Sequence, residues 1–343
     1  MPPLCHRRGN ETPPHRLTLP ERHSSTRDSF AGSEHPAVRV TALAGGTGAA
    51  KLLRGLAACL APRDLTIIGN TGDDTEVWGL HVSPDLDTVT YALAGLLDVE
   101  RGWGRADETF RCLEAMAALG APTWFSLGDR DLATHLARTA ALRAGEPLSV
   151  VTARLAAQLG VAARLLPMSD EPVRTRVRTT EATLSFQEYF VRDKALGEVV
   201  AVEYAGAPEA RPAPGVLAAL ADAELVVVCP SNPVTSVGPI LAVPGIAAAL
   251  AAARSVVGVS PIVGGAPVSG PAGRLMRARG LDVSPVGVAA AYAPWLRALL
   301  IDARDREVAP ALARAGVRAV VADVMMTDRA REVALARRVL EAA

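Results

Sequence analysis

The chain has 343 residues, of which 50% are hydrophobic, and 36 basic residues balance 36 acidic ones. This length and apolar content allow one large core or two modest ones, and the balanced charge argues against a nucleic-acid partner. Four widely spaced cysteines without a CxxC pair favour neither a zinc site nor a disulfide framework, and no apolar run reaches the roughly 18 residues that span a bilayer. We therefore expect a cytoplasmic protein with no nucleic-acid or membrane partner.

Residues 1–36 differ in composition from the rest of the chain. They are rich in Pro, Arg, His and Ser and contain few aliphatic residues, so they cannot bury enough surface to fold. They also lack the apolar core of a signal peptide. We predict a disordered extension over 1–36 and a single α/β domain over 37–343.

The first predicted elements are a strand, a turn and a helix. Residues 38–44 are apolar and β-branched, which indicates a buried strand, and residues 49–60 have helical spacing. The turn between them, called the glycine turn below, consists of Gly45, Gly46, Thr47 and Gly48. Backbone N–H groups at such a turn surround one concavity at the positive end of a helix dipole, where a phosphate binds.

Lys51 lies one helical turn after the glycine turn. Of the 36 basic residues only Lys51 and Lys194 are lysine, which suggests that a compact ammonium is needed here. The alternative is a tight turn followed by a solvated lysine. A P-loop would need Ser or Thr at Leu52, and a dinucleotide fingerprint would need Gly at position 51. The motif therefore indicates a phosphate or nucleotide without identifying it.

The later segments alternate between strand and helix patterns. Residues 65–69 read as a strand and 87–97 as a helix, and helices at 107–120, 131–144 and 149–160 predict a mainly helical insertion over roughly 98–175. Half-buried strands are expected at 176–186 and 198–204. Further strands are expected at 224–229, 255–260, 283–288, 298–302 and 319–323, with helices at 239–253, 270–279, 305–315 and 328–342. This alternation predicts a Rossmann-like, doubly wound, mostly parallel sheet.

Polar residues follow several of these strands, where ligands bind in such folds. Asn70 opens an Asn-Thr-Gly-Asp-Asp turn in which an acidic residue could hold a ribose hydroxyl, although an ordinary Asx turn is an equal alternative. Asp85 and Asp87 stand two residues apart at a helix start. One of them could be an N-cap, but the other would be spare, and paired carboxylates in a phosphate site suggest Mg²⁺.

Three more turns are candidates for substrate contacts. Asp129 and Arg130 could form a surface ion-pair turn or hold a polar substrate. Loops 230–238 and 260–273 offer small hydroxyls and backbone donors that suit a nucleotide. Only two histidines follow residue 36, so nucleophilic hydrolase chemistry has little support, whereas phosphoryl transfer needs mainly positioning and charge stabilisation.

Taken together, these motifs resemble the 2-phospho-L-lactate transferase family of coenzyme F420 biosynthesis. The matching stretches occur in the family's order: Ala-Gly-Gly-Thr-Gly-x-x-Lys-Leu-Leu at 44–53, Ser-Pro-Asp-Leu-Asp-Thr-Val at 83–89, Leu-Gly-Asp-Arg-Asp-x-Ala-Thr-His at 127–135, Leu-Pro-Met-Ser-Asp at 166–170, Pro-Ser-Asn-Pro-x-Thr-Ser at 230–236, and Pro-Val-Ser-Gly-Pro-Ala-Gly at 267–273. They cover nearly all of the chain after residue 38.

The resemblance implies an enzyme that transfers a phospho-acyl group, 2-phospholactyl or phosphoenolpyruvyl, from a guanosine diphosphate ester to the deazaflavin Fo. It also implies GMP release, formation of F420-0 or dehydro-F420-0, Mg²⁺ as the metal and a homodimer. Asp85 and Asp87 would hold Mg²⁺, and they and Lys51 would be catalytic. Fo would contact Asp87, Ser126, Asp129 and Arg130. The nucleotide would contact Gly45, Gly46, Thr47, Gly48, Lys51, Asn70, Ser231, Asn232, Ser260 and Gly264.

Ser126 departs from the family pattern, because archaeal members have a lysine there that lines the Fo pocket. The arginine-rich composition favours the enolpyruvyl donor, which bacterial relatives use. Two alternatives stay open. One is a non-catalytic regulator of the gluconeogenesis-factor type that binds nucleotide sugars, and the other is an NAD-dependent dehydrogenase, which Lys51 in place of the third glycine disfavours.

Overall fold

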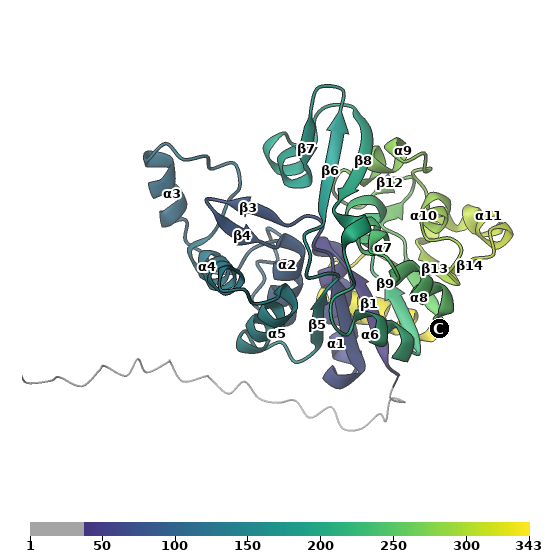
Figure 1. Ribbon diagram of the computed structural model, residues 1–343. Coiled ribbons are helices and arrows are strands. Elements are labelled where there is room, and N and C mark those ends of the chain that lie inside the picture. Colours follow the sequence, from purple (N-terminus) through teal and green to yellow (C-terminus); the bar gives the residue numbers. More distant parts are fainter. Residues whose placement is uncertain (1–37) are drawn as a thin grey trace, which may run out of the picture. The chain divides into compact units, whose positions relative to one another are not determined.

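A seven-stranded sheet forms the centre of the protein in a computed structural model that describes residues 38–343 (Figure 1). Its strands run in the order β14-β13-β10-β9-β1-β2-β5, and all neighbouring strands are parallel. The strands are β1 (Val40–Ala44), β2 (Leu65–Gly69), β5 (Arg164–Pro167), β9 (Leu225–Val228), β10 (Val256–Val259), β13 (Ala298–Ile301) and β14 (Arg318–Val321). The predicted Rossmann-like, doubly wound sheet is confirmed.

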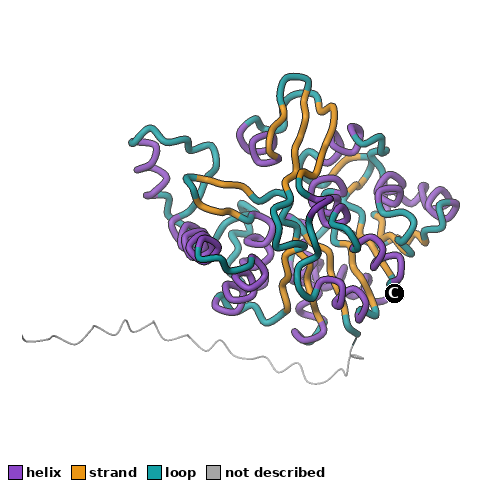
Figure 2. The backbone as a smooth tube through the Cα atoms, in the orientation of Figure 1, coloured by secondary structure: helices purple, strands orange, loops and turns teal. Residues whose placement is uncertain are grey.

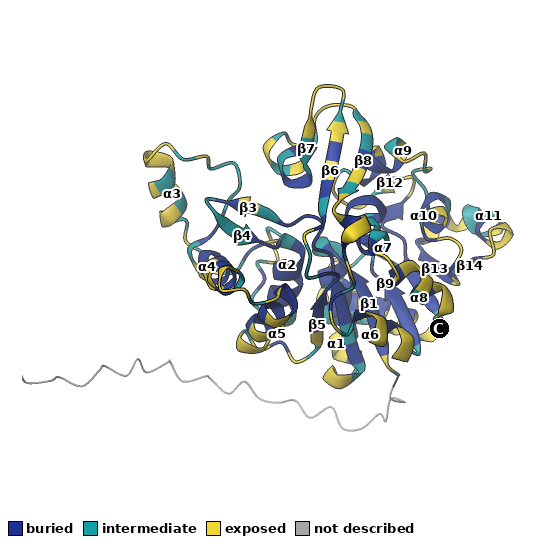
Figure 3. Cartoon of the chain, in the orientation of Figure 1, coloured by how far each residue is buried: buried dark blue, intermediate teal, exposed yellow. Residues whose placement is uncertain are grey.

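Helices cover both faces of this sheet, which explains why its central strands are mostly apolar and buried (Figure 3). The core on one face includes residues of α1, α2, α5 and α12, and the core on the other includes residues of α6–α11. The helices are α1 (Gly46–Cys59), α2 (Pro84–Leu93), α3 (Arg111–Ala118), α4 (Asp129–Arg143), α5 (Leu148–Gln158), α6 (Val216–Asp222), α7 (Gly238–Ala242), α8 (Ile246–Ala252), α9 (Ala272–Ala278), α10 (Pro285–Ala291), α11 (Ala309–Arg314) and α12 (Arg329–Glu341).

Three small antiparallel sheets and five short helical turns complete the described chain (Figure 2). The strands are β3 (Thr75–Val77) with β4 (Leu80–Val82), β11 (Ile262–Val263) with β12 (Ala266–Pro267), and β7 (Thr183–Ser185), β6 (Arg174–Thr179) and β8 (Val199–Ala205) in that order. The turns are η1 (Pro62–Asp64), η2 (Glu188–Arg192), η3 (Ala207–Glu209), η4 (Pro233–Val237) and η5 (Ala303–Val308).

The structure differs from several of the predicted elements. The strand predicted at 283–288 is wrong, because Ser284 accepts a hydrogen bond from the Gly287 N–H and Pro285 starts α10. The strand predicted at 176–186 is a hairpin of β6 and β7. The helix predicted at 239–253 is interrupted between α7 and α8, where Gly245 has a φ of 93°. The helix predicted at 305–315 is divided between η5 and α11.

The range predicted as a helical insertion, 98–175, contains α3, α4 and α5. It also contains β5, which pairs with β2 at the edge of the central sheet and was missed in the sequence. The predicted disordered extension, 1–36, lies outside the described residues. Between residues 38 and 343, no single helix is long and apolar enough to cross a membrane, and one bent pair, Pro233–Ala242 with Ile246–Ala252, meets the criterion by length and composition alone.

Candidate active site

The strand order reverses between β1 and β9, which are neighbours in the sheet although the chain continues from β1 to β2 on the opposite side. Such a switch point opens a crevice at the carboxyl ends of the two strands. The glycine turn follows β1, and the loop that begins at Pro230 follows β9. The fold therefore places two predicted nucleotide-binding segments at one crevice.

The glycine turn is packed too tightly for side chains. A Cβ atom on Gly45 would lie 2.5 Å from Asp85 Oδ2, and one on Gly48 would collide with the Pro230 carbonyl oxygen. Gly46 has a φ of 72°, a conformation that glycine adopts without strain. Ser231 Oγ donates a hydrogen bond of 2.8 Å to the Gly45 carbonyl. The structure thus brings the glycine turn, Asp85 and Ser231 together.

Asp85 is buried in the first turn of α2. Its Oδ2 accepts a hydrogen bond of 2.8 Å from Asn70 Nδ2, which also donates to the Thr235 carbonyl at 3.1 Å. Burial raises the pKa of Asp85 from 3.8 to about 6; the Asn70 hydrogen bond opposes this shift and the charge of Asp74 adds to it. Asn70, predicted to contact nucleotide, is therefore placed directly beside the predicted metal-binding carboxylate.

Two further carboxylates, Asp73 and Asp74, are buried in the same region. Burial and then the charge of Asp85 raise the pKa of Asp73 well above its usual value. Asp74 Oδ2 accepts from Ser83 Oγ at 3.0 Å and lies 2.9 Å from His81 Nε2. Oδ1 of each residue is buried without a hydrogen-bond partner in the described chain. The sequence pointed to a ribose contact here, whereas the geometry gives a cluster of mutually repelling carboxylates.

We expect Asp85 to make the metal-free protein less stable as pH rises from 4 to 7. Its folded pKa, about 6, exceeds the ordinary 3.8, so the folded state binds more protons in this window and the free energy of unfolding falls through it. A shift of about two units corresponds to about 3 kcal/mol. Urea unfolding would be measured with a chelator at pH 4.5 and 7.5. The free energy of unfolding of Asp85→Asn, relative to that of the wild type, should be higher at pH 7.5 than at pH 4.5. The same difference in unfolding free energy between variant and wild type at both pH values would contradict this prediction.

Asp87 is held differently from Asp85. Both of its carboxylate oxygens accept hydrogen bonds from the Arg138 guanidinium on α4, with 3.0 Å between Nη1 and Oδ2. Burial, the largest single effect, would lower the pKa of Arg138, but the charge and hydrogen bonds of Asp87, together with the charge of Asp74, raise that pKa overall. The two predicted metal ligands therefore have different surroundings: Asp85 faces the glycine turn, and Asp87 forms a buried ion pair.

The ion pair belongs to a larger buried network between α2 and α4. His135 Nδ1 lies 3.7 Å from Asp87 Oδ2, and its Nε2 lies 3.3 Å from Asp131 Oδ1. Tyr91 donates a hydrogen bond of 2.6 Å to Asp131 Oδ1. Arg138, Tyr91 and His135 were not among the residues predicted to form the site. The spacing of Asp131, His135 and Arg138 on α4 was the signal that could have grouped these three residues.

Asp129 and Arg130, two of the residues predicted to contact Fo, form no hydrogen bond with the acidic cluster, which consists of Asp73, Asp74 and Asp85. The Asp129 carboxylate accepts hydrogen bonds from Thr109 Oγ1 and from the backbone N–H groups of Arg111 and Cys112, which start α3. Asp129 thus caps the amino-terminal end of α3. Arg130 is exposed and Ser126 is half-buried. Their predicted contacts with Fo stay predictions.

The remaining predicted nucleotide contacts lie along the carboxyl edge of the sheet. Asn232 Oδ1 accepts from the Val234 N–H at 2.9 Å at the start of η4. Ser260 follows β10, and its side chain bonds within its own turn to Ile262. Gly264 N–H donates to Asp305 at 3.0 Å. Lys51, half-buried on α1, forms no ion pair within the described residues.

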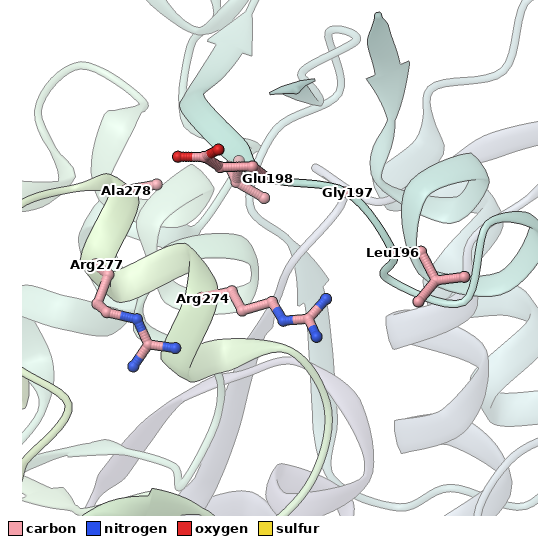
Figure 4. Close-up of a pocket in the computed structure, with 7 residues that line it drawn as sticks. Leu196, Gly197, Glu198, Arg274, Arg277 and Ala278 are labelled. Atoms are coloured by element: carbon pink, nitrogen blue, oxygen red, sulfur yellow. The ribbon is translucent and has the colours of Figure 1, made fainter. Parts of the chain in front are cut away.

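A separate open groove of about 670 Å³ lies between the start of β8 and α9 (Figure 4). Figure 4 shows Arg274 and Arg277 extending from α9, with Glu198 close to Ala278 at the end of that helix. Its lining includes none of the predicted site residues and none of the buried acidic residues. We therefore place the candidate active site at the glycine turn.

Comparisons with known proteins identify the family of this chain. The model of the family "2-phospho-L-lactate transferase CofD" matches residues 40–340. A phosphoenolpyruvate transferase from Streptomyces griseus is 48% identical, covering 89% of this chain and 98% of that protein. A 2-phospho-L-lactate transferase from Methanosarcina acetivorans is 44% identical, covering 85% and 95%. A solved UPF0052 family protein from Bacillus halodurans, 16% identical, has a similar fold, with a TM-score of 0.58 over 88% of this chain and 98% of that one.

Proposed function

We propose, since the chain belongs to the 2-phospho-L-lactate transferase CofD family, that it transfers a phospho-acyl group from a guanosine diphosphate ester to the deazaflavin Fo. The reaction would release GMP and form F420-0 or dehydro-F420-0 in coenzyme F420 biosynthesis. Relatives called phosphoenolpyruvate transferase reach 48% identity and those called 2-phospho-L-lactate transferase reach 44%, which favours the phosphoenolpyruvyl ester. The observation that supports a catalytic site is the buried carboxylate of Asp85 against the glycine turn.

The acidic cluster fits a hard divalent cation. Asp73 and Asp85 are buried, their charges repel each other, and Asp73 Oδ1 lacks a hydrogen-bond partner in the described chain, so a cation would relieve an existing electrostatic cost. Among residues 38–343, no three His, Cys, Asp or Glu side chains form a ready-made metal-binding group. Mg²⁺ often takes one or two protein carboxylates and completes its shell with water and substrate phosphates.

We therefore propose that Asp85 and Asp73 hold Mg²⁺, which would neutralise the diphosphate oxygens. The earlier prediction of Asp87 as a ligand would require its carboxylate to leave Arg138 or to share it. The backbone N–H groups of the glycine turn and the Lys51 ammonium would hold the diphosphate. Proposed partners also include a second copy of the chain in a homodimer.

In the transfer step, an Fo hydroxyl oxygen would attack the phosphorus that carries the acyl moiety. The new P–O bond forms as the bond to the GMP oxygen breaks, so GMP takes the electron pair of the broken bond. The hydroxyl proton would pass to one of the two neighbouring carboxylates, Asp85 or Asp87.

Product analysis tests this proposal directly. The full-length protein would be incubated with Fo, Mg²⁺ and either the phosphoenolpyruvyl or the 2-phospholactyl guanosine diphosphate ester. We expect GMP release with both substrates present, a product with the mass of dehydro-F420-0 or F420-0, and faster turnover of the phosphoenolpyruvyl ester. Nucleotide binding without GMP release from either ester would contradict the transferase proposal and favour the non-catalytic regulator.

A further inference from the structure

A short closed loop, residues 97–105, lies between α2 and α3 and is called the Trp103 loop here. An antiparallel bridge between Leu97 and Arg105 closes it. Inside it, Asp98 N–H donates to the Gly104 carbonyl at 3.2 Å, and Gly102 N–H donates to the Asp98 carbonyl at 2.9 Å. These backbone bonds fix the loop at its base and hold residues 102–104 at its tip.

The tip of this loop rests on the glycine turn. Thr47 Oγ1 donates a hydrogen bond of 3.1 Å to the Gly102 carbonyl, although the two residues are 55 positions apart in the chain. A Cβ atom on Gly102 would lie 3.2 Å from Thr47 Cγ2, so the backbone at Gly102 packs closely against the Thr47 side chain. The residue that follows Gly102 is therefore adjacent to the phosphate-binding segment proposed above.

That residue is Trp103, which is 41% exposed. The Arg101 guanidinium carbon lies 5.3 Å from the centre of its indole ring and 5.1 Å from the centre of the Phe110 ring. Arg101 is itself fixed by an ion pair of 2.8 Å with Asp98. One side of the indole thus contacts a fixed cation, while a large part of its surface stays in contact with solvent.

We propose that Trp103 is a substrate-binding residue that stacks on a planar heteroaromatic ring of a ligand bound at the glycine turn. The proposal rests on the proposed function, since both substrates named there carry such a ring: the deazaflavin of Fo and the guanine of the diphosphate ester. An aromatic side chain stacks on planar rings of either kind because stacking needs a flat apolar face rather than a specific hydrogen-bond pattern.

Isolated exposed hydrophobic side chains are common on protein surfaces. Trp103 differs from them in its position beside the glycine turn and in the fixed guanidinium beneath it, which orders the ring before any ligand binds. An ordered ring loses little conformational freedom on binding, and this favours affinity.

Equilibrium binding by the full-length protein tests the proposal. Fo would be titrated by its own fluorescence and GDP by calorimetry, with the wild type, Trp103→Leu, Trp103→Phe and a control variant. The control is Leu217→Ala on α6, which removes a side chain of similar exposure, 43%. We expect Trp103→Leu to weaken one of the two ligands by roughly 10- to 100-fold, and Trp103→Phe to keep most of the affinity. The affected ligand identifies whether the ring is deazaflavin or guanine.

Wild-type affinity of Trp103→Leu for both ligands would overturn the proposal. So would a change in its oligomeric state, measured by light scattering, with both affinities intact, because the indole would then contact a second copy. Binding is measured here without the donor ester, so the result does not depend on turnover. If the wild type binds Fo or GDP but releases no GMP from either ester, the transferase proposal fails while the stacking proposal is still decided by the affinities.

Discussion

Asp85→Asn should slow GMP release by roughly 10²- to 10³-fold, the loss typical of removing one electrostatic contact to a developing charge. Asparagine keeps the size of the side chain and can still pair with Asn70, but it provides no negative charge for a cation and no proton acceptor. The measurement is the rate of GMP release at saturating Fo and donor ester, followed by chromatography. The Mg²⁺ dependence of the residual rate should also be weakened.

The same variant should be more stable than the wild type at pH 7.5 without metal, because it removes a buried charge that repels its neighbours. Loss of activity with a gain in stability separates a catalytic role from simple unfolding. Asp323→Asn, an exposed carboxylate paired with Arg331, serves as the control and should leave the rate unchanged. A wild-type rate in Asp85→Asn would exclude Asp85 from the reaction.

Arg138→Met should lower the free energy of unfolding by about 3–5 kcal/mol, the cost of leaving one partner of a buried ion pair without its counter-charge. The Arg138 side chain is 4% exposed and that of Asp87 is 7%, so water cannot replace the lost hydrogen bonds. Urea denaturation at pH 7.5 measures the effect. GMP release should fall as well, because Arg138 links α4 to the helix that carries Asp85.

Two variants make this result specific. Arg154→Met breaks a pair with Glu146 whose side chains are 42% and 36% exposed, and it should cost at most about 1 kcal/mol. Asp87→Leu combined with Arg138→Met removes both charges and should recover much of the lost stability. If the double variant is no more stable than Arg138→Met, the unpaired charge is not the cause. The rate of GMP release by the double variant then shows whether Asp87 has a role beyond the ion pair, because such a role would leave the rate low even after stability is recovered.

The sequence predicted the central sheet well because its signals are local. Each strand except β5 has a run of apolar residues that is typical of a strand buried on both faces. β5 was missed because Arg164–Pro167 offers only two leucines between Arg and Pro. The strand predicted at 283–288 is instead the start of α10, because Ser284 is its N-cap and Pro285 its first residue. A helix cap can thus override a β-branched pattern.

The sequence by itself determined the fold class and the glycine turn, and it predicted an anionic ligand, because a strand, a turn and a helix that follow one another directly are typical of an anion-binding site. Only the tertiary structure decided which side chains surround that site. Ser231 is 186 positions from Gly45, Arg138 is 51 from Asp87, and Gly102 is 55 from Thr47. Such contacts depend on strand order and helix packing. In the sequence Asp85 and Asp87 therefore looked like two equivalent metal ligands. In the structure their surroundings differ, because Asp85 is buried against the glycine turn and Asp87 pairs with Arg138.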